Sequence, residues 1–262
     1  MKIKFFKPTL TKLKEKQISN NLNPETIALE KEITYFIKTL KLNKINLNLF
    51  LHNLKSLKIK NTNDLEIEND FIEAYYDLID NEITILNFEN PHVIFHELFH
   101  TSSTKKQEDL INSGFSTIKI DQNNQFKSGV GFYLNELYTE YLTQKFFGKD
   151  NDCLYNMDIP IIQRFEQIFG EKQLYNHYFQ SPGIFLPEQI TSASEKKDYI
   201  EFVNNLDLLE DKKMIYAETY ETNPDKHLLE EIKYYYKVID EFLYNLENKK
   251  QYYSKTYTKR EK

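Results

Sequence analysis

The spacing of apolar residues along the chain predicts helices near both ends and strands between them. Residues 24–41 place apolar side chains three and four positions apart, as on one face of a helix, and Pro24 suits its first turn. Residues 224–248 carry a longer stripe of the same spacing. Everything after Asn156 reads as helical, with breaks near 182–183 and 223–224, whereas residues 45–59 favour neither helix nor strand.

Two β-hairpins are predicted in the middle of the chain. Apolar and polar residues alternate over 82–86 after a turn at 78–81, which predicts a hairpin over 71–86. A second hairpin is predicted over 114–131, with its turn at 121–124. A helix should follow each hairpin, the first opening at Asn90 and the second running from about Asn135 to Phe147. The pattern as a whole predicts an α+β fold.

Composition and charge narrow the class of protein. The chain has 262 residues, 40% hydrophobic and 28% charged, as expected of a soluble globular protein with one large domain or two small ones. A net charge of −6 disfavours nucleic acid as a partner. A single cysteine, Cys153, excludes an internal disulfide and a cysteine metal cluster. Neither a signal peptide nor a membrane-spanning run stands out, so we expect a cytoplasmic protein without a membrane partner, with export by another route left open.

The helix after the first hairpin carries the clearest chemistry. It is apolar on most sides, which is typical of a buried helix, yet it contains His96, Glu97 and His100, and buried polar groups need partners. Residues at i and i+4 lie on one face of a helix, so both imidazoles can reach one ion. Glu97 lies beside that ion and can take a proton from metal-bound water. We therefore predict a zinc site with His96 and His100 as ligands and Glu97 as the general base.

The helix after the second hairpin offers the third ligand. Catalytic zinc usually has three protein ligands and one open position. Glu136 is predicted to be the third ligand, and Glu140, one turn later, to hold the outer ring nitrogen of a ligating histidine. As an alternative, Asn135 caps this helix and Glu136 is only a first-turn acid favoured by the helix dipole. Against that alternative, Glu136 and Glu140 repel each other unless a cation lies nearby.

Together the two segments, His96-Glu-Leu-Phe-His100 and Asn135-Glu-Leu-Tyr-Thr-Glu140, resemble the motifs of the gluzincin, thermolysin-like zinc metallopeptidases. They also look like small zinc-peptidase-like proteins of Gram-positive bacteria, and the resemblance covers about 71–147. Leu137 and Glu140 depart from the family pattern, which usually has a small residue and an aspartate at these positions. The metzincin pattern does not fit, since Lys106 stands where that class needs a histidine.

This resemblance implies a zincin-like fold and a metallopeptidase. A small twisted sheet would lie beside the active-site helix within 1–150, and 151–262 would be a helical part that forms one compact unit with it. An edge strand along the cleft would pair with an extended peptide, and 82–86 is the expected strand. The activity implied is hydrolysis of peptide bonds in a peptide or protein substrate, with one Zn²⁺ per chain.

The remaining histidines are harder to assign. His177 is the best candidate for a transition-state oxyanion donor, with helix packing as its alternative. No partner motif accompanies His52, His92 or His227, and we interpret them as structural or surface residues. Two other functions stay open: a zinc-binding effector with a single intracellular partner, and a helical interaction protein whose motif is coincidental and binds no metal. The substrate and the oligomeric state do not follow from the sequence.

Overall fold

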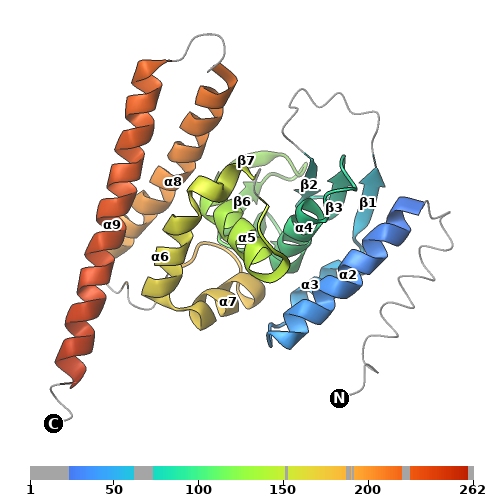
Figure 1. Cartoon of the computed structure of the whole chain (residues 1–262), viewed down its shortest axis with the longest axis horizontal. Helices are drawn as coiled ribbons and strands as arrows, with labels where there is room; N and C mark the ends of the chain where they lie inside the picture. Colours follow the sequence, from blue (N-terminus) through green and yellow to red (C-terminus); the bar gives the residue numbers. More distant parts are fainter. Residues whose placement is uncertain are drawn as a thin grey trace.

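The described part of the chain is an α+β fold with eight α-helices and two small sheets (Figure 1). The computed structural model describes residues 24–61, 73–150, 153–186, 190, 192–219 and 225–258. The elements up to residue 147 are α2 (Pro24–Leu42), α3 (Asn48–Asn53), β1 (Lys58–Asn61), β2 (Ala74–Asp77), β3 (Glu82–Ile85), α4 (Pro91–Ser103), β4 (Thr104–Gln107), β5 (Leu110–Ser113), β6 (Ser116–Ile120), β7 (Phe126–Val130) and α5 (Phe132–Phe147). Only helices follow: η1 (Leu154–Met157), α6 (Ile159–Phe169), α7 (Glu171–Gln180), α8 (Ala193–Thr219) and α9 (Lys226–Thr258).

The first sheet contains the first predicted hairpin, but its strand order corrects one expectation. β2 and β3 pair antiparallel, with the turn stabilised by Asp77, whose carboxylate accepts the backbone N–H groups of Ile79 and Asp80 at 2.7 and 3.0 Å. β1 pairs parallel with the other side of β3, giving the order β1-β3-β2. The prediction that 82–86 forms the edge strand is therefore wrong. It failed because β1 comes from 45–59 and its continuation, where the apolar pattern was ambiguous.

The second sheet is larger than the hairpin predicted for it. β6 and β7 form that hairpin, and Asp121 accepts the backbone N–H groups of Asn123 and Gln125 at 2.7 and 2.9 Å in its turn. β4 and β5 extend it to an antiparallel order β4-β5-β6-β7, which fills the connection between α4 and α5. These two strands were not predicted because α4 passes into β4 without a glycine or proline, and β4 is polar and mostly exposed.

Helix α4 is held by packing along its length and by asparagines at both ends. Leu98 and Phe99 are fully buried, and the ring of Phe99 lies 4.8 Å from that of Phe36 on α2. Burying such a side chain stabilises a fold by about 1.5–3 kcal/mol. The Asn90 side chain accepts the His92 backbone N–H at 3.1 Å, and Asn53 Nδ2 on α3 donates to the carbonyls of Thr101 and Thr104. These contacts fix the position of the predicted active-site helix.

Helix α5 begins at Phe132, earlier than predicted, because a distant residue caps it. Asp207 on α8 accepts the backbone N–H groups of Gly131 and Tyr133 at 2.8 and 2.9 Å. Asn135 is already inside the helix, since its N–H bonds to the Gly131 carbonyl. The alternative in which Asn135 caps this helix is therefore wrong.

The helical second half packs onto α4 and α5. One hydrophobic core includes buried residues from α2, α4, α5, α6, α7, α8 and α9. Figure 1 shows α8 and α9 side by side at one end of the molecule, with α4 and α5 in the middle. The break near 182–183 is confirmed, the one at 223–224 lies outside the described residues, and α9 continues past 248 to Thr258. Among the described helices, none is long and apolar enough to cross a membrane.

Candidate metal centre

Helices α4 and α5 bring three potential ligand atoms to one point. The Nε2 atoms of His96 and His100 lie 3.1 Å apart, and each lies 3.2 Å from Oε2 of Glu136. Both imidazoles come from one face of α4, while the carboxylate comes from the second turn of α5. The three residues form a group that could hold a metal ion. The three residues predicted as ligands thus lie close together, although the two helices that carry them are separated along the chain by the four strands β4–β7.

The size of this triangle fits a small tetrahedral ion. In a regular tetrahedron with metal–ligand bonds of ~2.0–2.1 Å, as zinc makes to nitrogen and oxygen, two ligand atoms lie ~3.3–3.4 Å apart. The observed edges of 3.1–3.2 Å are close to that value. The side chains of His96 and His100 are 11% and 8% exposed, whereas that of Glu136 is 29% exposed. Glu136 is therefore the most exposed of the three residues.

Hydrogen bonding orients the His96 ring toward the centre. Its Nδ1 lies 3.2 Å from Oε2 of Glu140, and an ionised carboxylate only accepts, so Nδ1 carries a proton. Nε2 of His96 then faces Oε2 of Glu136 and Nε2 of His100, an arrangement that is unfavourable unless a proton or a metal ion lies between these atoms.

The pKa values of the same groups show how strongly the centre attracts positive charge. Burial alone would lower the pKa of His96, but hydrogen bonds to Glu136 and Glu140 raise it to about 10. Burial acts to raise the pKa of Glu136, yet its charge and hydrogen-bond contacts with His100 and His96 hold that pKa well below its usual value. A proton or a metal ion at the centre would supply the positive charge that these groups stabilise.

Glu97 lies beside the centre and faces the first sheet. It is 7% exposed, and the backbone N–H of Tyr76 on β2 acts to lower the pKa of its carboxyl group. Burial raises the pKa of Glu97, while the nearby imidazoles of His96 and His100 act in the opposite direction. The strand that runs beside α4 is therefore β2, an edge of its sheet, and not 82–86.

The outer nitrogens of both imidazoles have polar contacts from α5. Glu140 meets His96 as predicted, and it also contacts His92, whose Nε2 lies 2.9 and 3.1 Å from its two carboxylate oxygens. His92, for which the sequence offered no partner motif, thus has a buried carboxylate as its partner. The amide of Asn135 lies 3.3 Å from Nδ1 of His100 while its Oδ1 accepts the Phe115 backbone N–H at 3.2 Å. The contact between His92 and Glu140 could not be predicted from the sequence, because the two residues lie 48 positions apart.

His177 does not contact the described residues of the centre. Its Nε2–H donates to the Gly183 carbonyl at 2.7 Å, and its ring lies against Phe115 and Phe185 with centroids 5.3 and 4.9 Å away. Burial lowers the pKa of His177, so the ring is neutral. These contacts favour the packing alternative over the oxyanion donor.

Tyr155 on η1 is a residue that sequence reasoning missed. Its ring lies nearly parallel to that of His96, with centroids 6.3 Å apart and an interplanar angle of 13°. Burial, followed by the charges of Glu136 and Glu210, raises its pKa well above the usual value, so the phenol stays protonated. No motif marked Tyr155, because nothing in the sequence shows that η1 folds back over α4.

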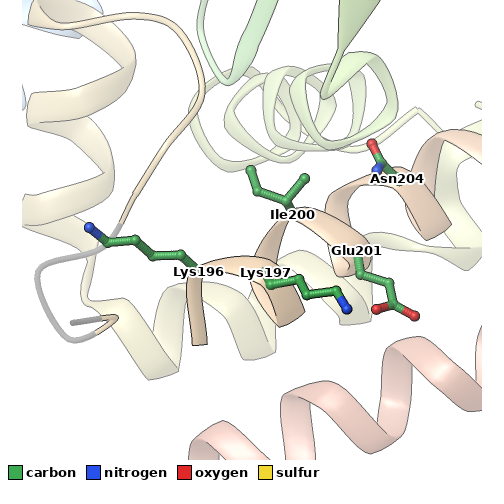
Figure 2. Close-up of a pocket in the computed structure, with 5 residues that line it drawn as sticks. All are labelled: Lys196, Lys197, Ile200, Glu201 and Asn204. Atoms are coloured by element: carbon green, nitrogen blue, oxygen red, sulfur yellow. The ribbon is translucent and has the colours of Figure 1, made fainter. Parts of the chain in front are cut away.

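A surface hollow elsewhere on the molecule does not overlap the centre. It lies on the first half of α8 and is lined by Lys196, Lys197, Ile200, Glu201 and Asn204 (Figure 2). None of these residues is among those that the motifs predicted, and the hollow carries no argument for the chemistry of the centre.

Comparisons with known proteins give no independent assignment. No protein-family model matches the chain, and neither the curated proteins nor the solved structures contain a match. The resemblance to the gluzincins therefore rests on the two sequence motifs.

Metal content should depend on Glu136. We expect about one metal equivalent per chain in protein purified without an affinity tag, and a clear loss in Glu136→Ala, because two imidazoles alone leave the coordination of zinc incomplete. Elemental mass spectrometry after dialysis measures this directly. Glu241→Ala, which removes an exposed carboxylate from α9, is the matched control and should keep the metal. Equal metal in both variants would mean that Glu136 is not a ligand.

Proposed function

We propose that this chain is a zinc-dependent peptidase in which His96, His100 and Glu136 hold the ion and Glu97 is the general base. The observation that carries the proposal is the convergence of two Nε2 atoms and one carboxylate oxygen within 3.1–3.2 Å of one another, with Glu97 next to His96 on the same helix. A binding site that only stabilises the fold has no need of an additional carboxylate at its edge.

The donor set favours zinc over magnesium and calcium. Two imidazoles with one carboxylate and an open position are typical of catalytic zinc, whereas structural zinc sites are closed by four protein ligands. Magnesium and calcium prefer sites made of oxygen atoms alone. In the described part of the chain, His96, His100 and Glu136 are the one group of this kind.

The residues around the centre divide the proposed reaction among them. When bound, zinc would lower the pKa of a coordinated water to ~7 and polarise the scissile carbonyl. Glu97 accepts the proton of the attacking water and passes it to the nitrogen of the leaving amine. The protonated hydroxyl of Tyr155 can donate a hydrogen bond to the oxyanion that develops, a role first predicted for His177.

The arrangement of elements supports a gluzincin-like assignment. The His-Glu-x-x-His segment lies on α4, the Asn-Glu-x-x-x-Glu segment lies on α5, and β2 runs beside α4 at the edge of a small sheet. An extended peptide could pair with the outer side of β2, so that its scissile bond reaches the metal. The peptide would then take its register from backbone hydrogen bonds and not from a deep pocket.

Replacing Glu97 by glutamine should separate metal binding from hydrolysis. Glu97→Gln keeps the shape of the side chain but cannot accept a proton, so we expect full zinc content with a loss of peptide hydrolysis of about 10²–10⁴-fold. Hydrolysis of a quenched fluorescent peptide library by wild type and variant measures it.

Two results would contradict the peptidase proposal. Near-normal turnover by Glu97→Gln would exclude Glu97 as the base. A wild-type protein that holds zinc but cleaves no member of the library would instead favour the zinc-binding effector.

Replacing Tyr155 by phenylalanine tests the proposed oxyanion donor. Tyr155→Phe keeps the ring that lies against His96 and removes only the hydroxyl, so kcat should fall about 10²–10³-fold with a smaller change in KM. Tyr234→Phe, at an exposed position on α9, is the control. An unchanged kcat in Tyr155→Phe would exclude this hydroxyl from the reaction.

A further inference from the structure

Glu140 is the meeting point of several donors outside the metal ligands. Its side chain is only 1% exposed, and it lies near Nε2 of His92, Nδ1 of His96 and Nε2 of Gln144, the last donating at 2.8 Å. A carboxylate offers about four lone-pair sites, so these contacts fill its capacity. Burial would raise the pKa of Glu140, but the hydrogen bonds from His92 and His96 lower it to about 2.

His92 differs from the other donors because it faces both carboxylate oxygens. Its Nε2 lies 2.9 Å from Oε1 and 3.1 Å from Oε2, whereas Gln144 contacts only Oε1 and His96 only Oε2. A donor placed between the two oxygens opposes rotation of the carboxylate. His92 itself is held in place, since its backbone N–H donates to the Asn90 side chain at the start of α4 and its side chain is 13% exposed.

His92 is linked to the candidate metal centre through a residue of the other helix, Glu140. His92 and His96 lie one turn apart on α4, and both contact the same carboxylate on α5. The orientation of Glu140 decides whether Nδ1 of His96 keeps its acceptor, and hence whether Nε2 of His96 points its lone pair at the centre. Groups that hold the outer nitrogen of a ligating histidine contribute to metal affinity.

We propose that His92 is a positioning residue of the metal centre, which acts through Glu140 to hold the His96 imidazole in its metal-binding orientation. This inference rests on the metal site of the proposed function and assigns a role to a residue outside the two motifs. It concerns retention of the metal, so it can be tested without any substrate.

Isosteric substitutions separate the hydrogen bond from the shape of the side chain. Glutamine places an amide NH₂ at nearly the reach of imidazole Nε2, while asparagine reproduces only the position of Nδ1. His92→Gln should therefore still donate to Glu140, and His92→Asn and His92→Ala should not. His227→Ala removes an exposed imidazole from α9 and controls for adventitious zinc binding.

Zinc affinity is the readout, measured by competition with a chromophoric chelator at constant pH. We expect His92→Ala and His92→Asn to raise the Kd for zinc about 10–100-fold, with His92→Gln within about threefold of wild type and His227→Ala unchanged. Urea unfolding of the metal-free proteins gives the second measurement. A merely structural role would lower the stability of the metal-free variants and leave their zinc affinity unchanged.

Two results would contradict the role of His92, and a third would also contradict the proposed function. Wild-type affinity in His92→Ala would show that His92 does not support the centre. Equal weakening in His92→Gln and His92→Ala would show that ring packing and not the hydrogen bond matters. If the wild-type protein itself binds no zinc, the proposed function fails together with this inference, whereas normal zinc binding in all His92 variants contradicts only the inference.

Discussion

The packing of α4 against α5 is the constraint on which the rest of the site depends. It brings two imidazole nitrogens and a carboxylate oxygen to within 3.2 Å of one another in a largely buried place, where lone pairs facing each other are unfavourable without a cation. The hydrophobic faces of both helices stabilise this approach, because Leu98 and Phe99 on α4 and Leu137 on α5 are fully buried. Burial of these apolar side chains thus offsets the cost of bringing the two imidazoles and the carboxylate together.

Contacts from distant parts of the chain set the positions of these two helices. Asn53 on α3 binds the last carbonyls of α4, and Asp207 on α8 caps the first N–H groups of α5. The sheet β4–β7 fills the connection between them, so the long spacing between the motifs is taken up by ordered structure. The helical second half therefore contributes to the site through the start of α5 and through Tyr155 on η1, and not only through the core.

The elements and ligands that the sequence predicted are those governed by local rules. The i, i+4 spacing of His96 and His100 puts both rings on one face of any helix, and the alternation over 82–86 marks a strand whatever its neighbours are. The sequence did not show which residues far apart in the chain contact each other in the fold. The placement of β3 inside its sheet, the contact of His92 with Glu140 and the cap from Asp207 all join residues far apart in the chain. His177 and Tyr155 show the same limit, since both are aromatic residues in helical segments and only the packing distinguishes them.

X-ray absorption at the zinc edge of the zinc-loaded protein tests the account most directly, because it reports which atoms touch the ion. The account predicts one zinc per chain with a first coordination sphere of nitrogen and oxygen at ~2.0–2.1 Å and the scattering pattern of two imidazoles. Cys153 is the single cysteine of the chain, so a cysteine sulfur ligand would have to come from it. A sulfur shell at ~2.3 Å, or a sphere without imidazole, would contradict the assignment of His96, His100 and Glu136 as the ligands.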